Sequence, residues 1–211
     1  AEQVASLQIE AINNPPVITV DDLPTNETNA TVNEDNGSSF SFPDIAATDA
    51  ESSAAGLVWG VFSEALNGSV EVSGTGYSPT VFSYIPNPDF SGSDHFVASV
   101  SDGDSNDTIM VRVVVHPHND PPQFLSVPPS STVNEDSDFM YSISAIDVDA
   151  NDTLVISSST LPKWLFFDDD LNGTATLWGS PDWDDFGNDV ILLTVTDSAG
   201  LTAVQGFAVS V

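Results

Sequence analysis

Hydrophobic and polar residues alternate with a period of two along much of this chain. Between residues 95 and 101, Phe96, Ala98 and Val100 occupy every second position, and the runs 109–115 and 190–197 show the same alternation. This period is typical of half-buried β-strands, and Gly, Pro, Asn and Asp separate the runs as turn residues do. No stretch has a convincing helical period. The pattern therefore predicts an all-β protein built from antiparallel strands.

The two halves of the sequence repeat each other. TVNED occurs at residues 31–35 and again at 132–136, and NNPP at 13–16 corresponds to NDPP at 119–122. A period of about 100 residues is the size of an immunoglobulin-like sandwich. We expect one domain at residues 13–118 and a second at residues 119–211. Residues 1–12 resemble the strand that precedes NDPP, so we expect the last strand of a preceding repeat or a linker there.

The chain is very acidic. Its 211 residues include 32 Asp and Glu against 2 Lys and Arg, which gives a formal net charge of −30. This charge excludes nucleic acid and anionic membranes as partners, because binding to them needs clustered Lys and Arg. The sequence contains no transmembrane run, so we expect no membrane insertion of this segment. Any acidic cluster must hold a cation, bind protons or stay hydrated.

Several motifs resemble the cadherin-like repeats of surface proteins. The first half contains YIPNPDFSGSDHFVASVSDG and a closing HNDPP, and it resembles the cadherin-like repeats of large bacterial adhesins. The second half contains SAIDVDANDTL, LPKWLFFD and TVTDSAG, and it resembles a dystroglycan-type cadherin-like (CADG) domain. The resemblance covers residues 13–211. It implies two tandem immunoglobulin-like Greek-key β-sandwiches, calcium dependence and an extracellular, cell-surface location.

Acidic residues from both halves are expected to converge on the linker at residues 119–122. On the strand path of such a sandwich, the lower turns of the first domain and the upper loops of the second lie beside this linker. Two carboxylates about 4 Å apart repel by about 4 kcal/mol at an effective dielectric constant of about 20. Ca²⁺, which takes roughly 6–8 oxygen ligands, suits such a place best, and cadherins use the equivalent positions. The expected ligands are Glu34, Asp89, Asp94, Asn119, Asp120, Asp147, Asp149 and Asp197.

The repeat places acidic groups at the other end of each domain as well. We expect these groups to form calcium half-sites, weak or empty, because a neighbouring domain would have to complete them. The upper half-site of the first domain comprises Asn13, Asn14, Asp49, Glu51 and Asp102, and the lower half-site of the second comprises Glu135, Asp182 and Asp185. The alternative for all these groups is a set of solvated acidic loops on a salt-adapted protein.

Two further motifs leave alternatives open. DDDLNG at residues 168–173 matches the start of an EF-hand loop, but Gly179 stands where that loop needs its bidentate Glu, so we expect a plain hairpin at Asn172-Gly173. Trp164 is expected in the core. Trp183, flanked by two Asp residues, is either an exposed platform for a sugar ring or a lid on the core.

The sequence thus favours a calcium-binding adhesion or spacer module of an extracellular array. Its expected partners are neighbouring repeats of the same chain and a homophilic or polysaccharide ligand. The competing hypothesis is a carbohydrate-binding appendage of a polysaccharide-degrading surface enzyme. We expect no catalytic activity in this segment, because its carboxylates fall on turns at the ends of sandwiches and no nucleophile or metalloprotease motif is present.

Overall fold

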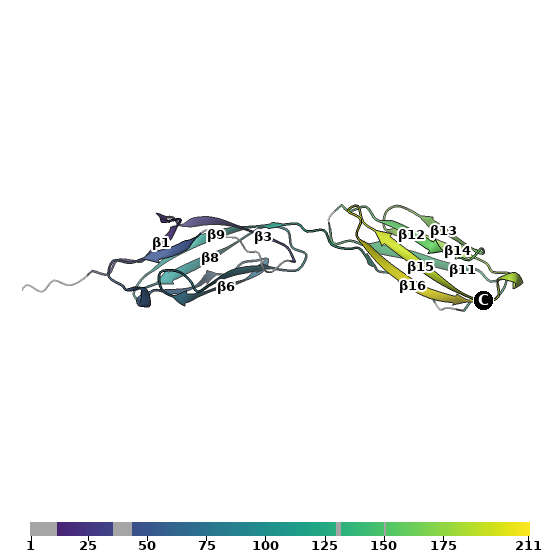
Figure 1. Ribbon diagram of the computed structural model, residues 1–211, viewed down its shortest axis with the longest axis horizontal. Helices are drawn as coiled ribbons and strands as arrows, with labels where there is room; N and C mark the ends of the chain where they lie inside the picture. Colours follow the sequence, from purple (N-terminus) through teal and green to yellow (C-terminus); the bar gives the residue numbers. More distant parts are fainter. Residues whose placement is uncertain (1–11, 36–43, 130–131, 150) are drawn as a thin grey trace, which may run out of the picture. The chain divides into compact units, whose positions relative to one another are not determined.

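Two compact units make up the chain. The structure is a computed structural model that describes residues 12–35, 44–129, 132–149 and 151–211. The first unit ends at His118, and the second runs from Asn119 to Val211 (Figure 1). The strand or linker expected at residues 1–12 lies, apart from Ile12, outside the described residues.

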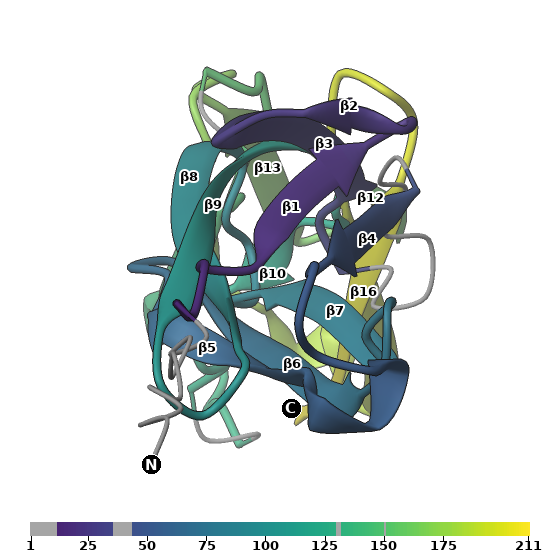
Figure 2. The same cartoon turned by 90° about the vertical axis from the view of Figure 1, so that its left-hand side faces the viewer.

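The first unit is a β-sandwich. Its smaller sheet has the strand order β2-β1-β4, and these strands lie side by side in Figure 2. The larger sheet has the order β3-β9-β8-β5-β6-β7. The strands of the first unit are β1 (Val17–Val20), β2 (Leu23–Pro24), β3 (Glu27–Asn33), β4 (Ile45–Thr48), β5 (Val58–Ser63), β6 (Gly68–Thr75), β7 (Val81–Pro86), β8 (Gly92–Ser101) and β9 (Asn106–His116).

One pairing in the first unit departs from the predicted antiparallel arrangement. Strands β3 and β9 are parallel, with Thr31 opposite Val114. Tight hairpins force antiparallel pairing only on strands that follow each other directly. Strands β3 and β9 are far apart in the sequence, so the rest of the unit serves as the crossover between them.

The alternating residues of the first unit form its core. Phe96, Ala98 and Val100 of β8 are fully buried, and the alternate residues of β9 from Ile109 to Val115 are buried as well. Arg112, on the opposite face of β9, forms an exposed ion pair with Glu27. The predicted inward faces of both strands are therefore confirmed.

The second unit is also a β-sandwich. One sheet has the order β10-β11-β14-β13 and the other has the order β12-β15-β16. A parallel bridge between Thr132 and Ser210 corresponds to the β3–β9 pairing of the first unit. The strands are β10 (Gln123–Phe124), β11 (Phe139–Ile146), β12 (Val155–Thr160), β13 (Leu165–Asp169), β14 (Thr174–Gly179), β15 (Asn188–Thr196) and β16 (Thr202–Ser210).

The core of the second unit contains the aromatic residue predicted there. Trp164 is buried, and its ring packs edge-on against Phe139 at a centroid distance of 5.9 Å. Ile191, Leu193 and Val195 of β15 are fully buried, as their alternation predicts. The predicted all-β fold of two tandem sandwiches is confirmed. The described residues contain helix only as 3-10 turns at Ala54–Gly56 and Trp183–Asp185, and they include no helix that could cross a membrane.

The DDDLNG motif forms a hairpin between β13 and β14, but not the two-residue turn expected at Asn172-Gly173. Residues 170–173 connect the strands, and the left-handed residues are Leu171 and Gly173. The side chain of Asn172 accepts a hydrogen bond from the backbone N–H of Thr174 and stabilises the turn in this way. A hairpin is thus confirmed in place of an EF-hand loop.

Candidate metal centre

Acidic residues gather at the upper end of the second unit, where strands β11 and β15 end. Asp147 is the first residue after β11, and Asp197 is the first after β15. Asn119 donates a hydrogen bond from Nδ2 to Asp197 Oδ2 at 2.8 Å, and the backbone N–H of Asp120 donates to Asp149 Oδ2 at 2.8 Å. The structure therefore brings together the five residues of the second unit that the sequence analysis proposed as ligands.

Three carboxylates form the centre of this group. Asp147, Asp152 and Asp197 each contribute one carboxylate oxygen, and these oxygens lie within 4.8 Å of one another. Asp152 was not among the expected ligands, although the DVDAND motif contains it. Its carboxylate accepts hydrogen bonds from the hydroxyl and the backbone N–H of Ser198. This contact ties the loop after β11 to the loop after β15.

One oxygen of this group is buried without a partner. Asp147 Oδ1 accepts the backbone N–H of Asp149 at 2.9 Å, but Oδ2 is buried and has no hydrogen bond. Burying a carboxylate oxygen without a donor or a cation is costly. The arrangement therefore favours a bound cation that would use the free oxygen of Asp147.

Asp197 remains ionised in this environment. Asp197 is only 6% exposed, and burial by itself would raise the pKa of its carboxyl. Hydrogen bonds from the Asn119 side chain and from the backbone N–H groups of Leu201, Gly200 and Ala199 outweigh burial and hold the pKa below its usual value. Asp197 is therefore available as a charged ligand at neutral pH.

No basic side chain balances these charges. The chain has two basic residues, Arg112 and Lys163. Arg112 pairs with Glu27, and Lys163 pairs with Asp185. The carboxylates at the upper end of the second unit therefore repel one another with no protein cation to offset the repulsion.

The first unit repeats this arrangement at its own upper end. Asn13 Nδ2 donates to Asp102 Oδ2 at 2.9 Å, as Asn119 donates to Asp197. The side chain of Asn14 donates to Glu51 at 2.6 Å. Asp49 Oδ1 accepts the backbone N–H of Glu51, and its Oδ2 is buried without a partner, as in Asp147. The five expected residues of this half-site therefore lie together.

Asp102 is held in its ionised form. The backbone N–H of Ser105 and the side chain of Asn13 donate to its carboxylate and lower its pKa far below the usual value. The equivalent hydrogen bond from Asn119 has the same effect on Asp197. Both units therefore use an Asn to keep the acidic residue after β8 or β15 charged.

At the lower end of the first unit, Glu34 is a buried acidic residue. It is 3% exposed, and its Oε1 accepts the backbone N–H of His118 at 2.7 Å. The next residue, Asp35, accepts the backbone N–H of Asp89 at 3.4 Å. The expected ligands Glu34 and Asp89 thus lie on neighbouring turns, and Asp35 of the NED motif is an acidic group between them that the expected set omitted.

Asp94, which was expected to be a ligand, has another role. Its Oδ1 accepts from the backbone N–H groups of Leu66 and His95, and its Oδ2 accepts from Asn67 N–H and Tyr84 Oη–H. These four hydrogen bonds use the four lone pairs of the carboxylate. Asp94 therefore fixes the turn between β5 and β6 through these contacts.

At the lower end of the second unit, the expected half-site is only partly assembled. Asp185 binds Lys163 Nζ at 3.3 Å and accepts the backbone N–H of Asp182 at 3.0 Å. These two contacts hold its pKa below the usual value. Asp185, which was expected in the half-site, thus has a protein cation beside it. Glu135 and Asp182 instead line a pocket of about 490 Å³.

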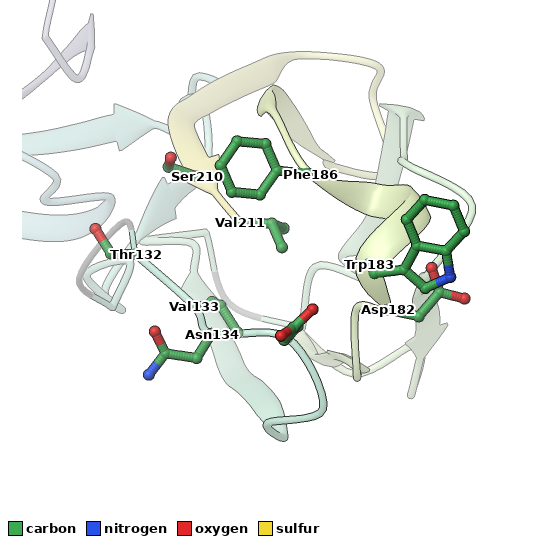
Figure 3. A pocket seen from close by; sticks show the side chains of 9 residues that line it. Thr132, Val133, Asn134, Asp182, Trp183, Phe186, Ser210 and Val211 are labelled. Atoms are coloured by element: carbon green, nitrogen blue, oxygen red, sulfur yellow. The ribbon is translucent and has the colours of Figure 1, made fainter.

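Trp183 lies on this pocket and does not cover the core. Its side chain is 76% exposed, and that of Phe186 is 84% exposed. Figure 3 shows Trp183, Asp182 and Phe186 on the same segment, opposite Val133 and Asn134, with Val211 between them. This exposure disagrees with the lid alternative.

Comparisons with known proteins agree with this architecture. Residues 13–114 match the family described as "Bacterial Ig domain", and residues 121–211 match the family described as "Putative Ig domain". No curated protein matches the sequence. Each half of the chain is therefore similar to an immunoglobulin-like domain, in agreement with the two sandwiches of the structure.

Solved structures of protocadherins have the same fold. Extracellular cadherin domains 3–6 of protocadherin gamma B2 match 93% of this chain at 13% identity and a TM-score of 0.62, and the match covers 46% of that chain. Domains 1–4 of protocadherin gamma B7 match 94% at 16% identity and a TM-score of 0.58, over 50% of that chain. The present chain thus spans half or less of their lengths.

Proposed function

We propose that this chain is a calcium-binding adhesion or spacer module of an extracellular array. The buried, unpartnered oxygen of Asp147 carries the proposal, because it lies among carboxylates that no basic side chain balances. The two Ig-family matches and the protocadherin fold support a role in surface arrays. In this proposal the segment has no catalytic role.

Calcium fits the donors better than other metals do. The group offers carboxylate and amide oxygens, which hard cations prefer, whereas the softer transition metals favour His and Cys. Mg²⁺ demands a stricter octahedral geometry and gives up its bound water reluctantly. The second unit would hold calcium with Asp147, Asp152 and Asp197, supported by Asn119, Asp120 and Asp149.

The proposal extends to the junction between the units. Glu34 binds the backbone N–H of His118, the last residue of the first unit, and Asn119 and Asp120 directly follow it in the sequence. We propose that Glu34 and Asp89 share calcium with the upper end of the second unit. Shared ligands would limit rotation about residues 118–120, so calcium would stiffen the array.

The test is thermal unfolding of the 211-residue chain over a range of calcium concentrations. Extracellular calcium modules bind at about 10⁻⁴–10⁻³ M. Raising calcium to about 100 times the dissociation constant adds about 2.7 kcal/mol to the free energy of unfolding of the unit that binds it. Asp147→Asn should remove this gain for the second unit. The same substitution should leave calcium-free stability unchanged or higher, because it removes one charge from a repelling group.

Glu64→Gln is the matched control, because Glu64 is an exposed acidic residue that is not among the proposed ligands. It should keep the full calcium response, and magnesium at equal ionic strength should give a much smaller one. An equal response of the wild type to calcium and magnesium, or a normal calcium response of the second unit in Asp147→Asn, would contradict the proposal.

A further inference from the structure

The outer face of one sheet of the second unit carries a row of large apolar side chains. Met140 of β11 pairs with Trp178 of β14, and Trp178 pairs with Phe166 of β13. The three side chains therefore lie side by side across neighbouring strands. The rings of Phe166 and Trp178 are inclined by 28° with their centroids 6.0 Å apart. Because they stand on a sheet, their positions are fixed before any ligand arrives.

This apolar row is exposed to solvent, and the side chains around it are polar. Met140 is 69% exposed, Phe166 is 58% exposed and Trp178 is 38% exposed. The next row on the same face contains Ser142, Thr176 and Asp168. A groove of about 330 Å³ follows the apolar row, and Asp138 and Ser180 also line it. Rings and hydrogen-bonding groups thus lie next to each other on one rigid surface.

Charge and size narrow the choice of occupant. A second copy of this chain also carries a net charge of −30 and would be repelled, and so would an anionic polysaccharide. A stable protein interface needs roughly 1,200–2,000 Å² of buried surface, far more than three side chains provide. A neutral ligand with apolar faces and many hydroxyl groups meets both conditions.

We propose that this row binds a neutral polysaccharide. The C–H face of a pyranose ring would pack against Trp178 and Phe166, because aromatic rings bury a large apolar area and lose little side-chain entropy when they do so. The sugar hydroxyls would donate to the Asp138 carboxylate and exchange hydrogen bonds with Ser180. This site uses none of the proposed calcium ligands, so it stands or falls independently of the proposed function.

The test is retention of the full chain on insoluble cellulose and chitin and in gels containing soluble β-glucan or xylan, with alginate as the anionic comparison. Binding to at least one neutral polymer is expected, in chelator as well as in calcium. Trp178→Ala and Phe166→Ala should each weaken it by tenfold or more. Trp183→Ala should not, because Trp183 lies on a different pocket.

Trp178→Phe is the control for misfolding, because it keeps an aromatic ring at this position of the sheet. It should retain binding better than Trp178→Ala, and all variants should unfold at temperatures near that of the wild type. The proposal would be overturned if the chain bound none of the neutral polymers. Loss of binding in Trp183→Ala alone would also overturn it, and so would retention that disappears in high salt, which would indicate a cationic ligand.

Discussion

The acidic residues of this chain differ in function because their nearest donors differ. Asp147 has a buried oxygen without a partner, Asp185 forms an ion pair with a lysine, and Asp94 accepts four hydrogen bonds. The sequence identifies all three as acids near strand ends and cannot separate them. The donors to Asp94 include the backbone of Leu66 and Asn67, which are 28 and 27 residues away. Contacts over such distances decide whether a carboxylate is free to bind a metal.

The repeat explains why the sequence could place some of the proposed ligands next to each other. Asn119 and Asp197 correspond to Asn13 and Asp102, and each pair is hydrogen-bonded in its own unit. Asp152 was not proposed from the sequence, because the resemblance pointed to the Asp-x-Asp pair at 147 and 149. The chain places it beside Asp147 and Asp197 only when the loop folds back onto Ser198.

At the residue scale we predict that Tyr84→Phe destabilises the first unit by about 1–2 kcal/mol. The substitution removes the Tyr84 hydroxyl, which donates to Asp94 Oδ2 at 2.9 Å in a buried site, and it leaves a charged acceptor with one donor fewer. Urea unfolding at neutral pH measures the change. Tyr77→Phe is the control, because Tyr77 is 51% exposed, and its loss of a hydroxyl should have no measurable effect. Equal effects of the two substitutions would contradict this role of Asp94.

At the scale of elements, alternation predicts which face of a strand is buried but not which strand lies beside it. The inward residues of β8, β9 and β15 follow the period of two. The parallel pairing of β3 with β9 cannot be predicted from that period, because the side chains of parallel and antiparallel strands alternate in the same way. The turn at residues 170–173 was misplaced for a similar reason. Asn-Gly usually forms a two-residue loop, but here Leu171 takes the left-handed conformation.

This turn yields a prediction for the hairpin β13–β14. Leu171 has a φ of 59° and is 66% exposed, so it carries the steric cost of a left-handed side chain and buries little apolar surface. Leu171→Asn should raise the free energy of unfolding of the second unit by about 0.5–1 kcal/mol, because Asn tolerates this conformation better. Calorimetry measures the change. Leu66→Asn, at a position that is 84% exposed with an ordinary φ, should give no gain, and a similar gain there would contradict the explanation.

At the scale of the whole molecule, the net charge of −30 sets the main constraint. Each unit folds around its own apolar core, and the carboxylates of Asp147, Asp152 and Asp197 gather outside the core of the second unit. A protein with two basic residues cannot neutralise those carboxylates by itself. The proposed calcium sites would therefore affect both the connection between repeats and the stability of the unit that binds the ion.

Small-angle X-ray scattering of the 211-residue chain, in millimolar calcium and in chelator, tests calcium stiffening of the junction most directly. If calcium stiffens the junction, the distribution of interdomain distances should be narrower in calcium than in chelator. Asp149→Ala should behave in calcium as the wild type does in chelator, and Glu64→Ala should behave as the wild type in both. Identical scattering curves with and without calcium, at neutral pH and low ionic strength, would contradict the junction site and leave residues 118–120 as a solvated linker.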